Sequence, residues 1–227
     1  MRRGLHNGTD RRIVWAAAAV MLAYPDERVL DRLDEVAAAV RPLPPVVRGP
    51  LEQMLDHLRS GDPVQLAEDY VRVLDQKRSC APYLTYYAHG DTRRRGMALV
   101  DVVETYRAAG FRPVGDELPD HLAVALEFAA TVDPVAGQEL LVRHRPGLDL
   151  LAGGLARAGS PYAALVQAVL ATLPPPTADQ RQVAATVASG GPPAELVGLT
   201  GRPGEPGWEG PEGMGRTAVP DPQEVPR

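Results

Sequence analysis

The chain has 227 residues, of which 44 % are hydrophobic, and this length can bury one substantial core in one domain or at most two. The net charge of −5 and the lack of a long basic block argue against non-specific binding to nucleic acid or to an anionic membrane. The single cysteine, Cys80, excludes a disulfide framework and a multi-cysteine metal centre within one chain, and it favours a reducing, cytoplasmic location.

The first apolar run, IVWAAAAVMLAY at residues 13–24, follows a basic start and superficially resembles a signal peptide. It is about 12 residues long, well below the roughly 20 that span a bilayer. No small-residue cleavage pattern followed by a mature start comes after it. We therefore expect a flexible N-terminus at residues 1–9, a first core helix capped by Thr9 or Asp10, and no stable membrane insertion.

Apolar residues at helical spacing predict helices along most of the chain, each bounded by proline, glycine or a capping residue. In chain order the pattern favours helices at 26–40, 47–60, 62–74, 92–109, 119–132, 135–144, 148–158, 162–173 and 177–188. Gly110 is expected at the left-handed end of the helix before it, and Pro119 at a first helical position.

The fold class is therefore predicted as all-α, a single domain of about eight to ten helices over residues 10–199, because no convincing alternating strand occurs. Residues 195–200, ELVGLT, could pack back on that domain. Residues 200–227 are rich in proline and glycine, and we expect them to form a disordered tail.

The densest polar chemistry lies in the segment from Tyr83 to Met97, YLTYYAHGDTRRRGM, which we call the signature segment. Its tyrosines could line a recognition surface that is apolar in body and wet at its edge. Positive charge is unfavourable at a helix amino end, so the three arginines after Asp91 suggest a role other than helix stability. Pro82 and Gly90 should confine the tyrosines to a short helix or a loop.

A helical metal-dependent hydrolase is the alternative reading, with His89, Asp91, Asp120 and His121 as ligands. The pattern is weak, because helical metal hydrolases usually carry a His-Asp dipeptide supported by further histidines. Cys80 is interpreted as a small buried hydrophobe rather than a nucleophile. A nucleic-acid binder is disfavoured by the acidic balance of the chain.

A second polar segment, Glu117 to His121, is a predicted companion of the signature segment. Glu117 and Asp120 could simply complement the amino end of the next helix. A charged histidine is mildly unfavourable there, so His121 could instead bind a ligand or fix the neighbouring loop.

Together the two segments, HGDTRRRG and DELPDH, resemble the nitrate reductase molybdenum cofactor assembly chaperones, the delta-subunit family of respiratory nitrate reductase, within the redox-enzyme maturation chaperones. The resemblance is close from Asp69 to Ala130, whereas Leu74 and Pro82 depart from the family pattern. The residues that it marks as partner-binding are Tyr83, Tyr86, Tyr87, His89, Asp91, Thr92, Arg93, Arg94, Arg95, Glu117, Pro119, Asp120 and His121.

The resemblance implies a cytoplasmic chaperone that is not an enzyme, has no cofactor of its own and is absent from the finished complex. Its implied partner is the immature catalytic subunit of nitrate reductase, held chiefly through that subunit's N-terminal segment until the molybdenum cofactor is inserted. The partner segment would be captured as a helix in a groove or as an extended peptide.

Overall fold

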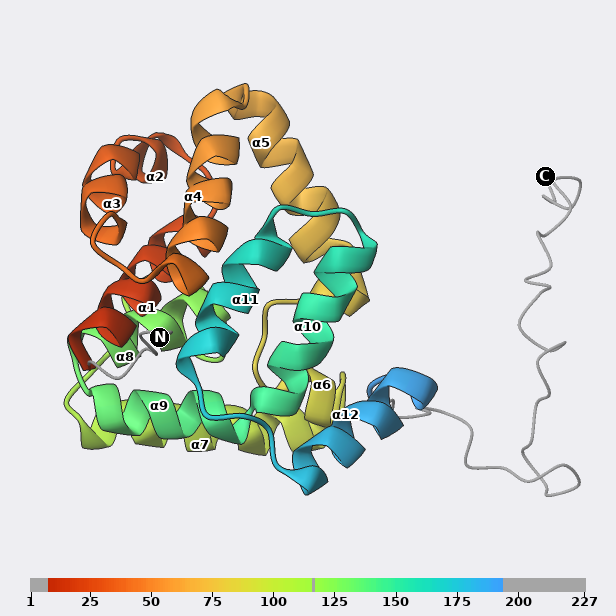
Figure 1. Cartoon of the computed structure of the whole chain (residues 1–227). Coiled ribbons are helices and arrows are strands. Elements are labelled where there is room, and N and C mark those ends of the chain that lie inside the picture. The colour runs from red at the N-terminus through yellow and green to blue at the C-terminus, as the bar shows by residue number, and fades with distance from the viewer. Residues whose placement is uncertain (1–7, 116, 194–227) are drawn as a thin grey trace, which may run out of the picture. The chain divides into compact units, whose positions relative to one another are not determined.

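A computed structural model describes residues 8–115 and 117–193, and the regular secondary structure in these ranges is helical throughout, as predicted. Ten of the twelve α-helices in these ranges have eight residues or more, and the other two, α2 and α6, have four each (Figure 1). The helices are α1 (Gly8–Leu22), α2 (Glu27–Leu30), α3 (Leu33–Val40), α4 (Pro45–Ser60), α5 (Pro63–Tyr70), α6 (Tyr86–His89), α7 (Arg93–Ala108), α8 (Leu122–Thr131), α9 (Pro134–Arg143), α10 (Arg145–Arg157), α11 (Tyr162–Thr172) and α12 (Ala178–Gly190).

A π-helical turn, Val71–Asp75, continues α5, and a 3-10 turn, Arg78–Cys80, follows it. None of the helices in the described ranges combines the length and the apolar character needed to cross a membrane. The predictions for residues 1–7, for the ELVGLT segment and for the tail at 200–227 lie outside the described residues.

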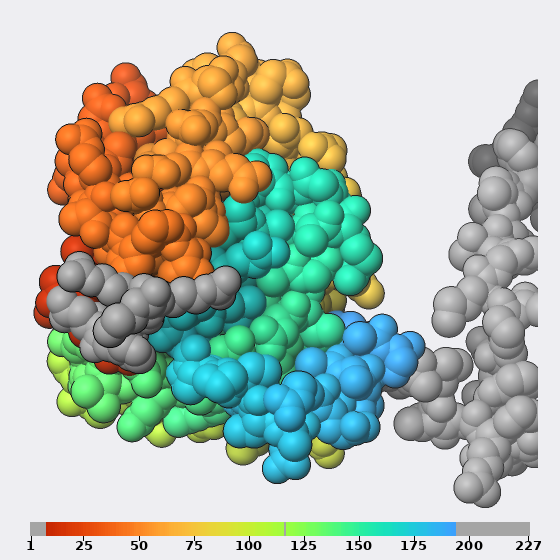
Figure 2. Space-filling model, in the orientation of Figure 1, coloured from red at the N-terminus to blue at the C-terminus, as the bar shows by residue number. Residues whose placement is uncertain are grey.

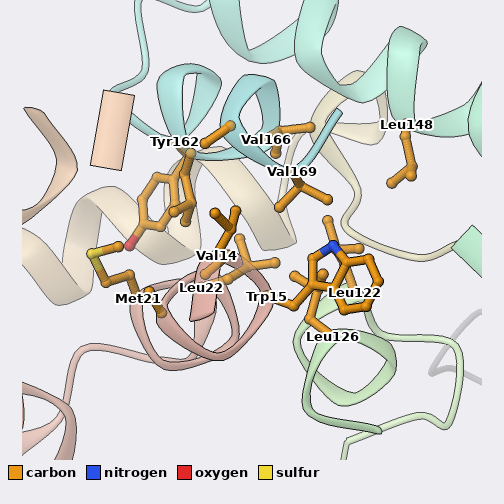
Figure 3. Close-up of a cluster of buried hydrophobic side chains, with 14 of the residues drawn as sticks. Val14, Trp15, Met21, Leu22, Leu122, Leu126, Leu148, Tyr162, Val166 and Val169 are labelled. Atoms are coloured by element: carbon orange, nitrogen blue, oxygen red, sulfur yellow. The ribbon is translucent and has the colours of Figure 1, made fainter. Parts of the chain in front are cut away.

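The core is centred on α1, which packs against α8 and α11, while α11 also packs against α4 and α10. Figure 3 shows side chains of these helices meeting in one apolar cluster, with Trp15 of α1 beside Leu126 of α8. The Trp15 indole donates a 2.8 Å hydrogen bond to Thr172 Oγ1, so the largest side chain of the core also satisfies its one polar atom. The α1–α8 contact therefore ties the helix that follows the DELPDH motif to the centre of the domain.

Several helix starts follow directly from local capping chemistry. Asp62 accepts hydrogen bonds from the backbone amides of residues 64 and 65, with Pro63 in the first turn of α5. Asp133 does the same for α9, where Pro134 is the first residue. Thr177 and Gln180 form a capping box at α12. A side-chain oxygen satisfies amides that the helix leaves unpaired, and proline tolerates this position because it has no amide hydrogen.

Three predicted boundaries are wrong. The helix expected at 26–40 is divided at residues 31 and 32, where the Arg32 N–H bonds to Val29 O at 3.2 Å and so tightens the turn after α2. Thr9 and Asp10 lie inside the first turn of α1 rather than before it. Pro119 precedes α8, because residues 119 and 120 form a turn closed by the bond from the His121 amide to Leu118 O, and His121 is extended to pair with an earlier part of the chain, described next.

Candidate functional site

The signature segment and the second polar segment meet in space. The backbone N–H of Leu84 donates to Asp120 O at 2.9 Å, and the N–H of Leu122 donates to Pro82 O at 2.7 Å. Between these two bonds, Tyr83 faces His121 in an isolated antiparallel bridge. The prediction that the two segments are companions is confirmed, and Pro82 takes part through the carbonyl that it retains.

A buried polar cluster, which we call the Asp120 node, locks this junction. Asp120 is fully buried, and its Oδ2 accepts hydrogen bonds from the Thr85 amide at 3.2 Å and from the Thr85 hydroxyl. Arg95 supplies the positive charge, with its Nη2 3.6 Å from the same oxygen and its Nε 3.3 Å from Thr85 Oγ1. A buried carboxylate requires such partners, so the node fixes α7 and the start of α8 to the segment before α6.

Aromatic rings enclose the Arg95 guanidinium. Its carbon lies 5.3 Å from the centre of the Tyr83 ring and 5.8 Å from that of Tyr86, distances at which a cation is attracted to a ring face. Tyr83 in turn packs edge to face on His121, with ring centres 5.4 Å apart. These contacts explain one arginine of the run, because Arg95 binds the buried Asp120 node. Arg93 and Arg94 are exposed at the start of α7.

His121 acts as the amino-terminal cap of α8, its Nδ1 accepting a 3.2 Å hydrogen bond from the Ala123 amide. Burial lowers the pKa of His121 to about 4, against the opposing effect of Asp120 and Asp75. The ring is therefore neutral near pH 7, as an accepting nitrogen requires. The reading that His121 fixes its loop agrees with this geometry.

The tyrosines do not form the exposed surface that the sequence suggested. Tyr86 and Tyr87 are only 6 % and 5 % exposed, and the Tyr87 hydroxyl donates to Ser79 O at 3.1 Å. Two glycines of α10 permit this burial. A Cβ on Gly147 would lie 3.2 Å from the Tyr87 ring, and one on Gly154 would lie 1.9 Å from Ser79 O.

Sequence reasoning missed these glycines, although their seven-residue spacing in RPGLDLLAGGLAR places both on one helix face.

Sequence reasoning also missed Asp75, an exposed carboxylate at the end of the π-helical turn. Burial, and then the charge of Glu117, raise the pKa of Asp75, and both carboxylates raise the pKa of Tyr83 after burial. The exposed edge of the Tyr83–His121 pair is thus negative.

Comparison with known proteins places this geometry in a family. Residues 41–166, which include both polar segments and the Asp120 node, match the family described as nitrate reductase delta subunit. The chain belongs to this family.

Individual relatives agree. A nitrate reductase molybdenum cofactor assembly chaperone, NarJ, of Escherichia coli is 32 % identical over 153 residues, which are 66 % of this chain and 65 % of that protein. The NarJ relative of Bacillus subtilis is 33 % identical over 168 residues, covering 74 % of this chain and 91 % of the relative. The nitrate reductase-like protein NarX of Mycobacterium tuberculosis is 40 % identical over 164 residues, 70 % of this chain, but the match spans only 24 % of NarX.

A solved structure shows the same fold. A crystal structure of a candidate redox enzyme maturation protein from Archaeoglobus fulgidus superposes with a TM-score of 0.53 at 26 % identity, covering 70 % of this chain and 90 % of the other. The helical architecture is therefore shared with the wider class of redox-enzyme maturation proteins.

For this member of the delta-subunit family, the metal-hydrolase alternative finds no assembled site. In the described ranges no three His, Cys, Asp or Glu side chains are placed to share a metal ion. Asp120 is occupied by Thr85 and Arg95, and the Nδ1 of His121 is occupied by the α8 amide. Asp91 is exposed and pairs with Arg95, with its Oδ1 3.5 Å from Arg95 Nη1.

The predicted partner-binding residues divide into buried and accessible groups. Tyr86, Tyr87, Asp120 and His121 are buried, so they support the site from within. Half-buried members are Tyr83, His89, Thr92, Arg95 and Pro119, and exposed members are Asp91, Arg93, Arg94 and Glu117. Thr92 does not cap α7 with its side chain, and its hydroxyl instead donates to His89 O at 2.7 Å. A direct contact with a partner is available chiefly to the exposed group.

Proposed function

We propose that this protein is a chaperone for the immature catalytic subunit of respiratory nitrate reductase, acting in the cytoplasm. It holds the subunit, chiefly through its N-terminal segment, until the molybdenum cofactor is inserted and the subunit can dock on the membrane. The observation that carries the proposal is the family membership, supported by the chaperone names of the Escherichia coli and Bacillus subtilis relatives.

The geometry supports a binding role for the signature segment rather than a catalytic one. Its strongest polar contacts are internal, since Asp120 and Arg95 both bond to Thr85 and pair with each other. The outer surface of this junction is charged. Exposed Arg93 and Arg94 lie at one end of α7. A preorganised charged surface of this kind sets the register and the association rate of a partner.

Arg94→Glu tests this role, because a negative side chain at the start of α7 favours the helix by a few tenths of a kcal/mol. A loss of binding would therefore not come from a weakened helix. We expect calorimetric titration with the N-terminal peptide of the catalytic subunit to show about ten-fold weaker binding for Arg94→Glu. Arg107→Glu, an exposed charge reversal in the last turn of the same helix, is the control and should bind like the wild type.

Co-purification provides the wider test. Tagged protein from cells respiring nitrate should retain the cofactor-free catalytic subunit and lose it once the subunit is complete. The proposal is wrong if the tagged protein retains the mature enzyme equally well or does not retain the subunit at all.

A further inference from the structure

The helix α12 is attached to the domain by very little. None of its thirteen residues is buried, and only Gln180, Ala184 and Val187 are even half-buried. It packs along α10, and its Gln180 side-chain amide donates a 2.8 Å hydrogen bond to Val142 O in α9. A helix of this length is only marginally stable on its own in water, so its position depends on these contacts and on its capping box. Figure 2 shows α12 lying on the surface of the domain.

The chain that leaves α12 rests on the signature segment. Gly191, with φ of 76°, turns the chain after α12, and the Pro193 carbonyl then lies against Gly90. A Cβ on Gly90 would be 1.7 Å from that oxygen, so only glycine allows the approach. Gly90 is buried between α6 and α7, in the HGDTRRRG motif itself. The chain directly after a weakly held helix therefore covers Gly90 at the α6–α7 junction.

We propose that α12 with Gly191–Pro193 is a displaceable strap, and that the face it covers on α10 and the α6–α7 junction is the docking surface for a partner helix. This inference rests on the proposed function, and it takes the N-terminal segment of the catalytic subunit, in helical form, as the occupant. The face already accommodates a helix whose contact stripe is only Gln180, Ala184 and Val187. A partner helix with larger apolar residues at this spacing buries more apolar area and replaces α12.

Competition with the strap also accounts for release. Apparent affinity equals intrinsic affinity multiplied by the open fraction, so a mostly closed strap lowers affinity and closes again when the partner leaves. Changes that open the strap must then strengthen partner binding, and changes that stabilise α12 must weaken it. This direction is opposite to that of ordinary damage to a binding site.

Two neighbouring alanines give a matched test. Ala184 lies on the contact stripe of α12, whereas Ala185 is exposed on its outer side. Ala184→Asp and Ala185→Asp change charge and helix propensity alike, and only the first removes the contact with α10. We expect Ala184→Asp to accelerate hydrogen exchange in α12 and to tighten binding of the catalytic subunit's N-terminal peptide at least about five-fold. Ala185→Asp should leave the affinity near that of the wild type.

Gly190→Ala tests the opposite direction. It adds a better helix former at a position where a Cβ meets nothing within 4 Å, and we expect about two-fold weaker peptide binding. In the wild type, saturating peptide should slow exchange in α10 and α6 and accelerate it in α12.

The strap proposal is wrong, while the proposed function stands, if the peptide binds but leaves hydrogen exchange in α12 unchanged. Binding in the open groove beside α5, lined by Tyr24, Val64 and Val71, would have the same meaning. Unchanged affinity for Ala184→Asp despite fast exchange in α12 also overturns it. If no peptide binds to the wild type or to Ala184→Asp, both the strap and the peptide-binding part of the proposed function fail, and co-purification of the whole subunit then decides the remainder.

Discussion

The Asp120 node gives the sharpest test of what holds the two polar segments together. Asp120→Asn keeps the shape of the side chain but removes its charge. The fully buried carboxylate accepts two hydrogen bonds from Thr85 and faces the Arg95 guanidinium at 3.6 Å. Asn gains nothing at the other oxygen position, because Asp120 Oδ1 is buried without a hydrogen-bond partner among the described residues.

The size of the effect follows from these contacts. Breaking a buried pair by removing one charge costs roughly 3–5 kcal/mol. Arg95 is 17 % exposed and keeps Asp91 as a second counter-ion, so the lower end applies, about 3 kcal/mol. For a domain of this size each kcal/mol lowers the melting temperature by about 2–4 °C, which predicts a decrease of about 6–12 °C.

Asp91→Asn is the matched control. Asp91 pairs with the same Arg95 at 3.5 Å, but its side chain is 64 % exposed, and an exposed pair contributes less than about 1 kcal/mol. Thermal unfolding, with urea unfolding to check that the m-value is unchanged, measures both variants. Equal small shifts for the two variants would refute the idea that the buried carboxylate organises the junction.

Two further predictions concern the interior. Gly154→Ala should destabilise the fold by more than about 2 kcal/mol, because its Cβ would lie 1.9 Å from Ser79 O, whereas Gly153→Ala meets only a flexible arginine end and should be neutral or slightly stabilising in urea unfolding. Burial lowers the pKa of both His121 and His144 to about 4 from 6.5, so the unfolded chain binds protons that the native state does not. Stability should be complete above pH 6.5 and fall towards pH 4, by at most about 3 kcal/mol per histidine, and a flat unfolding free energy between pH 7 and pH 5 would contradict this.

The helical plan could be predicted wherever its signals are local. Asp62-Pro63, Asp133-Pro134 and the capping box at Thr177 mark their helices because the capping atoms lie within three residues of the amides they satisfy. The start of α8 could not be predicted in this way. Pro119 lies in a turn and His121 is extended because it pairs with Tyr83, and short-range patterns contain no information about such a distant partner.

For the site, the sequence predicts which residues come together but not how exposed they are. The two motifs predict which residues gather, and the structure brings them together. Their exposure depends on neighbours far along the chain, and Tyr87 is buried because Gly147 of α10 leaves room for its ring. Three consecutive arginines also look alike in a sequence, yet successive residues of a helix point about 100° apart, so Arg95 turns inward while Arg94 faces solvent.

The bridge between Tyr83 and His121 has a consequence for how this chain can vary. Residues 85–119, which carry α6 and α7, begin and end at one point, where backbone hydrogen bonds lie on either side of the bridge. Between these ends the excursion also packs on the core, because Tyr106 of α7 lies on Phe128 of α8 with ring centres 4.8 Å apart, and Tyr87 of α6 lies against Gly147 of α10. The exposed residues of α7, such as Arg94 and Met97, can therefore change while α8 and α10 keep their places, provided that Tyr87, Tyr106 and the contact between Thr85 and Asp120 remain. In such an arrangement the recognition element can diverge to suit a new partner while the supporting core remains the same.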